Sequence, residues 1–208
     1  MQHLITQKEF PELFENISLL PSLKYSYPTL FHATTISAAK SILQHGLLTS
    51  KCGFIHGEMA IRPPEKTIYL SKHESSNNLN SELFTQNQDI VILEVSTNMI
   101  NENNIFPDDA FFCGFANEDY LVDHFEVAEV FNISLKEAEK FFNVICSLSG
   151  EELVEFTKPL WNFYLIQEGE ISVAQDIPKQ SIINIRDYNT GHILNLSHLK
   201  KNKPWQAY

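Results

Sequence analysis

Three residues with complementary chemistry occur in or beside short apolar segments of this chain: His32, Tyr69 and Glu170. A histidine ring nitrogen can hold a hydroxyl group, and the flat face of a tyrosine can stack on a planar ring. A carboxylate can stabilise positive charge that develops as a bond breaks. Each residue alone is also typical of a structural position, as a satisfied strand histidine, a half-buried aromatic and a solvated turn carboxylate. The functional hypothesis therefore depends on the three occurring together.

The segments that carry these residues are predicted to be strands. His32 lies in the apolar segment 29–34, Tyr69 in the segment 67–71, and Glu170 opens the segment 170–174. Alternation along the first strand places His32 on one face together with Leu30 and Thr34. On the second strand, Ser71 shares a face with Tyr69.

The remaining pattern predicts an α+β fold. Further strands are expected at 89–95, 162–167 and 181–188, and helices at 7–20, 37–43, 119–131, 134–147 and 150–160. Strands thus precede and follow a helical block, unlike the regular alternation of a parallel sheet. We expect one domain over residues 1–208, with a helical insertion at about 119–160.

Several local signals set the expected ends of these elements. Ser37 can cap the helix 37–43, and Gly46 stands where a left-handed helix stop is expected. Ser134 and Glu137 have the spacing of a capping box, and the last helix is expected to end before Pro159. Residues 49–66 are predicted to form an irregular surface loop, and 98–107 to be turn-like. The large apolar residues of the helical block are predicted to be core: Phe125, Val130, Phe131, Phe141, Phe142 and Trp161.

Taken in order, three motifs resemble the ADP-ribosyltransferase superfamily, in its His-Tyr-Glu branch of diphtheria-like toxins and poly-ADP-ribose polymerases. The first motif is Phe-His-Ala-Thr-Thr at 31–35, followed by a helix and Gly-Leu-Leu at 46–48. The second is Ile-Tyr-Leu-Ser at 68–71, and the third is Glu-Gly-Glu-Ile-Ser-Val at 168–173. The resemblance covers residues from about 28 to 186, and the helical block stands within it as an insertion.

The resemblance implies a split β-sheet core and an enzyme, a glycosyltransferase of the pentosyl type, that uses NAD⁺ as a substrate and needs no metal. Glu170 would stabilise the oxocarbenium-like ribose and hydrogen-bond a ribose hydroxyl, and His32 would hold a ribose hydroxyl. Tyr69 would stack on nicotinamide, while the backbone of Ala33 would hold its carboxamide. The residues expected to contact NAD⁺, besides the catalytic Glu170, are His32, Ala33, Thr34, Tyr69 and Ser71.

Glu168 raises a second resemblance, because Glu168-Gly-Glu170 has the Glu-x-Glu form of the arginine-modifying toxin branch. In that branch the first glutamate engages the acceptor. That branch has an arginine on its first strand, where this chain has His32, and the chain lacks the Ser-Thr-Ser run of that branch. Glu168 is therefore a candidate acceptor residue, and a solvated turn position explains it equally well.

Composition narrows the partners. The net charge is −11 and the chain has two arginines, so we expect a protein acceptor for the transferred ADP-ribose and disfavour nucleic acid. The three cysteines, Cys52, Cys113 and Cys146, suggest neither a disulfide framework nor a zinc site, and a reducing compartment fits them best. No signal peptide or membrane-spanning stretch is evident. An ordinary cytoplasmic enzyme and an effector delivered into a host cytosol both fit, and the oligomeric state is open.

Two other hypotheses are retained. An NAD⁺-using RNA 2′-phosphotransferase shares the fold and the His-x-Thr strand, but it relies on several basic residues to hold RNA. A catalytically inactive relative that serves as a binding or inhibitor protein is the other hypothesis, and strong negative charge suits a basic partner.

Overall fold

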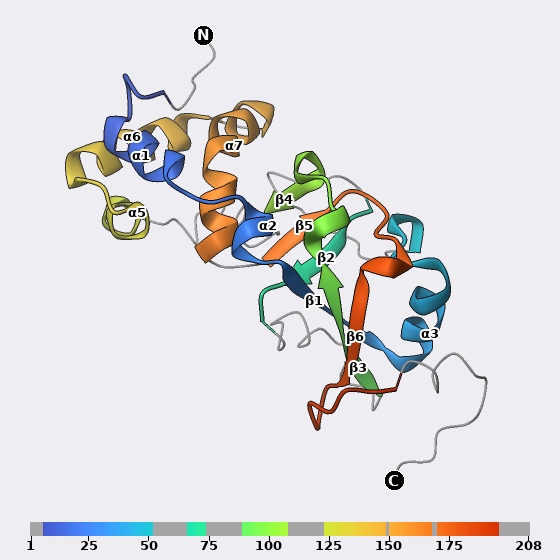
Figure 1. The fold of residues 1–208 in the computed structure, drawn as a ribbon. Helices are drawn as coiled ribbons and strands as arrows, with labels where there is room; N and C mark the ends of the chain where they lie inside the picture. Colours follow the sequence, from blue (N-terminus) through green and yellow to red (C-terminus); the bar gives the residue numbers. More distant parts are fainter. Residues whose placement is uncertain are drawn as a thin grey trace. The chain divides into compact units, whose positions relative to one another are not determined.

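The fold comes from a computed structural model of the 208-residue chain, which describes residues 6–51, 66–73, 89–107, 123–148, 150–167 and 170–195. The chain divides into two compact units (Figure 1). Unit 1 comprises residues 1–26, 54–65 and 106–168, and unit 2 comprises 27–53, 66–105 and 169–208. The prediction of a single domain with an insertion stays a prediction.

Unit 2 is built around a six-stranded sheet, with part of its edge strand β4 extending into unit 1. The strands are β1 (Thr29–Thr35), β2 (Ile68–Ser71), β3 (Ile90–Ser96), β4 (Ile105–Pro107), β5 (Glu170–Val173) and β6 (Ile182–Asp187). Their order in the sheet is β4-β5-β2-β1-β3-β6, and the pairs β5–β2, β2–β1, β1–β3 and β3–β6 are all antiparallel. The chain is therefore a mixed α/β structure with an antiparallel sheet, compatible with the expected α+β class.

The two faces of this sheet differ in polarity. One face carries buried aliphatic side chains: Leu30, Ile68, Leu70, Val91, Leu93, Ile171, Val173 and Ile185. The opposite face carries Tyr69, Ser71, Glu94, Ser172, Asn184 and Arg186, together with Phe31 and the buried Ile92. A face that mixes hydroxyl, amide and charged groups can recognise a polar ligand, whereas the aliphatic face supplies the core.

The helix α3 (Ile36–His45) follows β1 directly and contacts β1 and β3. Its N-cap is Thr35, whose hydroxyl accepts a hydrogen bond from the Ala38 amide at 3.2 Å, so the predicted cap at Ser37 is wrong by two residues. Ser37 instead lies inside the first turn, with its hydroxyl 3.0 Å from that of Thr35. The helix ends at Gly46 as predicted, but the φ of 89° and ψ of −179° at Gly46 are not those of the expected left-handed stop.

Gly46 stands at a close approach of two segments of unit 2. The next residue, Leu47, exchanges backbone hydrogen bonds with Ile177 at 2.9 Å in each direction. The 3-10 turn η1 (Thr49–Lys51) follows, and the Thr49 amide and hydroxyl both donate to the Asp176 carboxylate. These bonds fasten the segment after α3 to the connection between β5 and β6.

The pairing of β6 with β3 contains an irregularity that the sequence pattern does not reveal. Glu94 pairs with Asn184 and Val95 pairs with Ile182, so Ile183 is left without a Cα partner on β3. Ile182 and Ile185 are both buried while Ile183 is exposed. The even alternation expected over 181–188 is therefore broken by a β-bulge.

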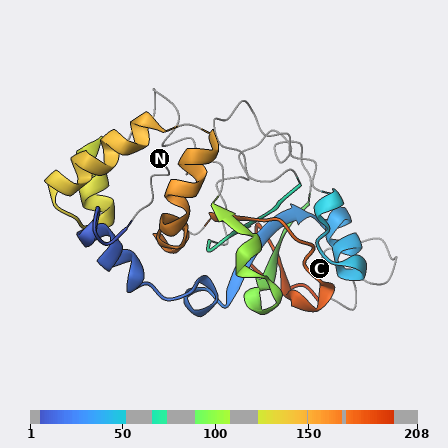
Figure 2. The same ribbon diagram turned by 90° about the horizontal axis from the view of Figure 1, so that it is seen from above.

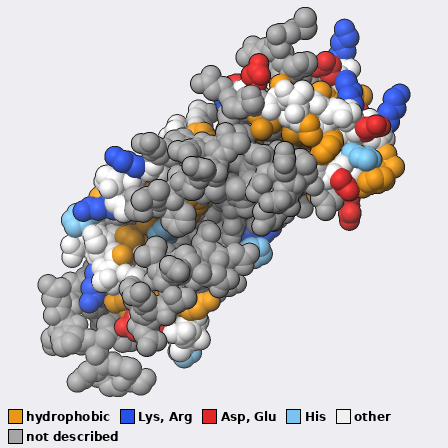
Figure 3. Space-filling view, turned by 180° about the vertical axis from the view of Figure 1, so that it is seen from behind, with side chains coloured by type: hydrophobic (Ala, Val, Ile, Leu, Met, Phe, Trp, Pro, Cys, Tyr) orange, Lys and Arg blue, Asp and Glu red, His pale blue; other side chains and the backbone are white. Residues whose placement is uncertain are grey.

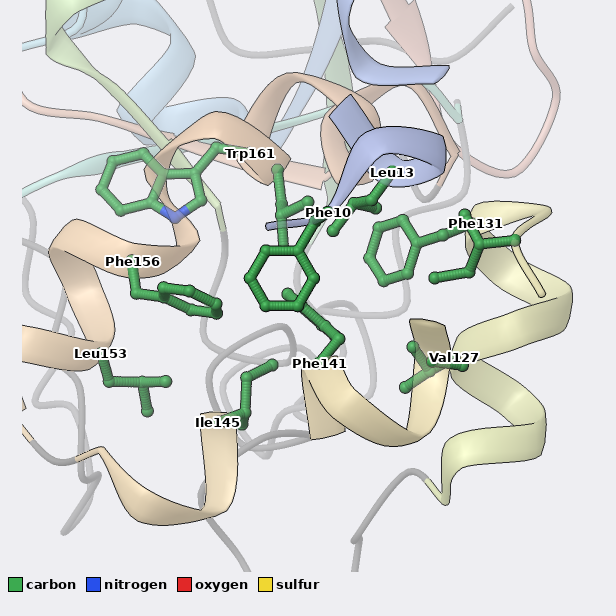
Figure 4. Close-up of a cluster of buried hydrophobic side chains, with 12 residues drawn as sticks. Phe10, Leu13, Val127, Phe131, Phe141, Ile145, Leu153, Phe156 and Trp161 are labelled. Carbon is green, nitrogen blue, oxygen red and sulfur yellow. The ribbon is translucent and has the colours of Figure 1, made fainter. Parts of the chain in front are cut away.

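Unit 1 is helical. Its helices are α1 (Pro11–Ser18), α2 (Leu23–Ser26), α5 (His124–Phe131), α6 (Leu135–Ser147) and α7 (Gly150–Gln167). Figure 2 shows α1, in blue, beside the yellow helices α5 and α6. Side chains from α1 and its N-cap and from α5, α6 and α7 converge on one apolar cluster, nine of whose residues are labelled in Figure 4. The predicted N-terminal helix thus shares a core with the expected insertion.

Aromatic rings form the centre of this cluster. The ring of Phe10 makes edge-to-face contacts with Phe141 and Phe156, with centroids 5.8 and 5.9 Å apart. Burying a side chain of this size contributes about 1.5–3 kcal/mol. The expectation of a core role is confirmed for Phe131, Phe141 and Trp161, whereas Phe125 and Val130 are 57% and 48% exposed, so that expectation is wrong for these two residues.

Two further expectations for unit 1 are corrected. Helix α7 does not end before Pro159 but continues to Gln167, and the expected strand 162–167 is its last part. The buried residues Leu153, Phe156, Leu160 and Trp161 recur at helical spacing on both sides of the proline, so core packing favours one continuous helix. The segment 98–107, predicted to be turn-like, contains the 3-10 turn η4 (Glu102–Asn104) and then the short strand β4.

The N-terminus of α6 forms one of the two hydrogen bonds of the expected capping box. The hydroxyl of Ser134 accepts from the Glu137 amide at 3.4 Å, as predicted. The Glu137 carboxylate instead accepts from the Leu13 amide of α1 at 2.8 Å. The Ser134 amide donates to Glu12 of α1 at 2.5 Å, so the reciprocal bond of the box is replaced by contacts between the two helices.

Candidate active site

The candidate residues His32, Tyr69 and Glu170 lie on three adjacent strands of the sheet. Strand β1 carries His32, β2 carries Tyr69, and β5 begins with Glu170, and these strands stand next to one another in the order β5-β2-β1. In the sequence, 37 positions separate the first two and about a hundred separate the second from the third. The topology therefore brings the three strands together, but not their side chains on one face. His32 pairs with Leu93 and lies on the aliphatic face, whereas Tyr69 and Ser71 lie on the opposite face.

The strand registers define a row of residues across the polar face. Glu170 pairs with Ser71, Ser71 pairs with Phe31, and Phe31 pairs with Glu94. Tyr69 stands in the adjacent row on the same face, opposite Ser172. The expectation that Ser71 and Tyr69 share a face is confirmed.

The pairing between β1 and β2 is short. Within the described residues, these strands pair at a single position, Phe31 with Ser71, whereas β1 and β3 pair at seven positions. On their other sides, β1 pairs with β3 along its whole length and β2 pairs with β5. The residues that follow Phe31 on β1 are His32, Ala33 and Thr34, the segment expected to hold the ligand.

The His32 side chain makes a direct link between β1 and β2. Its Nδ1 atom lies 2.9 Å from the backbone carbonyl oxygen of Tyr69. A carbonyl oxygen can only accept, so Nδ1 carries the hydrogen and donates it. The ring is therefore held by the strand that presents Tyr69, and its orientation is set by the backbone.

Burial keeps the His32 ring neutral. Desolvation lowers the pKa of His32 below its ordinary value of 6.5, and the hydrogen bond to the Tyr69 carbonyl raises it by a smaller amount. In the neutral ring with its hydrogen on Nδ1, the other nitrogen, Nε2, has a free lone pair. His32 can thus accept a hydrogen bond from a hydroxyl group while it donates to Tyr69.

The other candidate residues on β1 and β2 differ in burial. Ala33, Thr34 and Tyr69 are half-buried, and Ser71 is buried. The Ser71 hydroxyl accepts a hydrogen bond from the His73 amide at 3.0 Å, which tightens the turn at the end of β2. This environment combines an aromatic face, hydroxyl groups and backbone edges within two strands.

The third motif contains two glutamates, Glu168 and Glu170. Glu170 is the first residue of β5, and its backbone stands opposite Ser71. Glu168 lies outside the described residues, as does most of the expected loop 49–66.

A second polar cluster on the same face was not anticipated from the sequence. Glu94 is buried in the middle of β3, where it accepts a hydrogen bond from Asn184 at 2.6 Å and forms an ion pair with Arg186. The available signal was one charged residue inside the apolar run 90–95, together with the polar alternation at 184 and 186. Because its oxygens are occupied by these partners, Glu94 is suited to fixing β6 on β3 rather than to catalysis.

The described residues contain no group of three or more histidine, cysteine or acidic side chains arranged to hold a metal ion. None of the described helices has both the length and the apolar character that crossing a membrane requires.

Comparisons with known proteins identify no relative of this chain. No family model, no curated protein and no solved structure matches this chain.

Proposed function

We propose that this protein is an NAD⁺-dependent mono-ADP-ribosyltransferase that modifies a protein side chain. The observation that carries the proposal is the placement of His32, Tyr69 and Glu170 on adjacent strands, with the His32 ring bonded to the Tyr69 carbonyl. The short β1–β2 pairing supports the further proposal that the sheet is the split core of the ADP-ribosyltransferase fold.

The chemistry follows from the groups present. Breaking the bond between nicotinamide and ribose sends the electron pair to the nicotinamide nitrogen and leaves positive charge on the ribose. Glu170 supplies the carboxylate that stabilises this charge. The acceptor then attacks the anomeric carbon with its own electron pair and releases a proton, which completes the transfer.

His32 and Tyr69 act by positioning the dinucleotide. The Nε2 lone pair of the neutral His32 accepts a hydrogen bond from a ribose hydroxyl, and the Tyr69 ring stacks on nicotinamide. Ala33 and Thr34 offer backbone groups next to His32, and Ser71 lies beside the start of β5. Orienting the scissile bond in this way lowers the entropic part of the barrier.

The proposal extends to the setting of the enzyme. NAD⁺ is consumed as a substrate, no metal takes part, and the enzyme works in a cytoplasm, either its own or that of a host. The expected acceptor is a protein because the chain is acidic and poor in arginine.

The experiment is incubation of the protein with NAD⁺ labelled in its adenylate phosphate and with a cell lysate. We expect label to appear on a protein, to be removed by protease and to resist nuclease. The variant His32→Ala, tested in parallel, should label protein at least about tenfold less than the unchanged chain, because the substitution removes a positioning contact.

Two results would contradict the proposal and select between the other hypotheses. Loss of phosphate from a 2′-phosphorylated RNA, without labelling of any protein, would indicate the RNA 2′-phosphotransferase reaction. Absence of labelling together with absence of nicotinamide release would indicate a binding protein that lacks activity.

A further inference from the structure

Two adjacent isoleucines at the start of β6 have opposite environments. Ile182 is 7% exposed and stands opposite Val95 on the aliphatic face, whereas Ile183 is 45% exposed and is removed by the β-bulge from the pairing with β3. Figure 3 shows hydrophobic side chains, in orange, at other places on the surface, so exposure alone is ordinary. The informative feature is that the buried and the exposed side chain are identical.

A regular antiparallel register without the bulge places the other isoleucine inside. Asn184 stays opposite Glu94 in this register. Even pairing then sets Ile183 opposite Val95 and turns Ile182 to the other face of the sheet. The side chain that fills the buried position is an isoleucine in both registers. Burial of apolar area therefore does not select between them.

The part of β6 that follows the bulge is fixed in either register. The Asn184 side chain donates to the Glu94 carboxylate at 2.6 Å, and Arg186 forms an ion pair with the same carboxylate. On the outer side of the strand, the returning segment 192–194 donates a hydrogen bond to the Ile185 carbonyl at 2.7 Å. Within the described residues, the bonds between this segment and β6 stop at Ile185. The start of β6 is therefore held less tightly than its end.

The connection before the bulge can take up one residue. It begins where Ile177 exchanges backbone hydrogen bonds with Leu47, and it contains the 3-10 turn η6 (Lys179–Ser181). Residues 178–183 lie between this anchor and Asn184. A register without the bulge moves the extra residue from the strand into this connection. Connections between elements accommodate one added residue at small entropic cost.

The observed register has unfavourable features next to the bulge. Ser181 is 1% exposed, and its hydroxyl has no hydrogen-bond partner among the described residues. A buried hydroxyl without a partner has a free-energy cost. The bulge itself interrupts the ladder of hydrogen bonds between β3 and β6. Both features narrow the free-energy difference between the observed register and the register without the bulge.

We propose that the start of β6 is a two-register switch, in which Ile182 and Ile183 exchange the buried position opposite Val95. Residues 184–187 keep their pairing with β3 in both states, and the exchange changes which isoleucine is buried. Two packings of one sequence that differ by a small free energy form a bistable element. This inference is independent of the proposed catalytic activity.

The first test compares the thermal unfolding of alanine variants of the full chain. Ile182→Ala, Ile183→Ala and the double variant are measured beside Ile185→Ala. Ile185 is the matched control, because it is a fully buried isoleucine of the same strand. Its neighbours are Asn184 and Arg186, so no second isoleucine stands beside it to take its place.

We expect Ile185→Ala to lower the melting temperature by at least about 5 °C. Ile182→Ala should lower it by less than about half of that amount, because Ile183 takes the vacant position. The double variant should exceed the sum of the two single losses by at least about 3 °C. Losses that simply add would overturn the proposal.

The second test traps each register with a disulfide, in a chain whose three cysteines are replaced by serine. Val95→Cys is combined with Ile182→Cys for the observed register and with Ile183→Cys for the register without the bulge. Each pair is equilibrated in a glutathione buffer, and mass spectrometry of protease fragments identifies the disulfide. Cysteines whose side chains point apart do not close, so the second disulfide reports the second register.

We expect both disulfides to form, the second with an equilibrium constant within about 100-fold of that of the first. Closure of the first pair alone, or of neither pair, would show a single register and overturn the proposal.

Discussion

At the scale of single residues, the strand position of His32 was predicted from the sequence, whereas its tautomer and its neutral state come from the structure. The sequence predicted its strand and its role as a hydroxyl acceptor, and the structure adds the tautomer, since the Tyr69 carbonyl requires hydrogen on Nδ1. The neutral state follows from burial, which depends on the aliphatic neighbours that other strands supply. Such neighbours cannot be identified from a lone histidine in one segment.

The lowered pKa of His32 predicts how NAD⁺ affinity depends on pH. Above pH 6.5 the ring is neutral and, under the proposed function, accepts a ribose hydroxyl, so NAD⁺ affinity should stay constant there. Below that value affinity should fall as pH passes through the lowered pKa, because protonated Nε2 can no longer accept. The stability of the folded chain should also decrease below pH 6.5, since the unfolded chain takes up this proton first.

Calorimetric titration of NAD⁺ at several pH values measures this dependence. The variant His32→Gln supplies the control, because its amide does not titrate, and it should bind about tenfold more weakly with a reduced pH dependence. An identical pH profile in both proteins would contradict the role given to His32.

At the scale of elements, sequence patterns predicted type better than boundaries. Six predicted segments occur near their expected places: 29–34, 37–43, 67–71, 89–95, 170–174 and 181–188. The seventh, 162–167, was predicted to be a strand and is helical. The failures have tertiary causes. Pro159 lies inside α7 because the core on both sides of it selects a helix, and Glu137 bonds to α1, a helix more than a hundred residues away.

The segment after α3 offers a prediction about stability. A Cβ atom added at Gly46 would lie 2.4 Å from the Ile177 carbonyl oxygen, and the φ of 89° is itself unfavourable for other residues. Gly46→Ala should therefore lower the free energy of unfolding by about 3 kcal/mol or more. Urea unfolding, followed by circular dichroism, measures the change.

Gly191 provides a matched control for this substitution. It also has a positive φ, 68°, but an added Cβ would meet no atom within 4 Å. Gly191→Ala should cost about 1 kcal/mol from backbone strain alone. Equal losses in the two variants would contradict the close approach of the Ile177 carbonyl oxygen to Gly46.

At the scale of the whole molecule, the two units differ in net charge and in whether they carry the candidate site. Unit 2 holds the candidate site and contains 8 acidic and 9 basic residues, whereas unit 1 contains 18 acidic and 6 basic residues. The sequence gives the total charge, but its assignment to one unit requires knowing that residues 1–26 belong with 106–168. The proposed site likewise depends on strand order, which a single sequence does not contain.

Under the proposed function, the sheet of unit 2 cleaves NAD⁺ through Glu170, and release of nicotinamide measures this cleavage. We expect the purified protein to release nicotinamide slowly without any acceptor, and Glu170→Gln to reduce the rate by at least about 100-fold while NAD⁺ still binds. Glu168→Gln, two residues away, should retain the release. No nicotinamide from the wild-type protein, or an undiminished rate in Glu170→Gln, would contradict the claim.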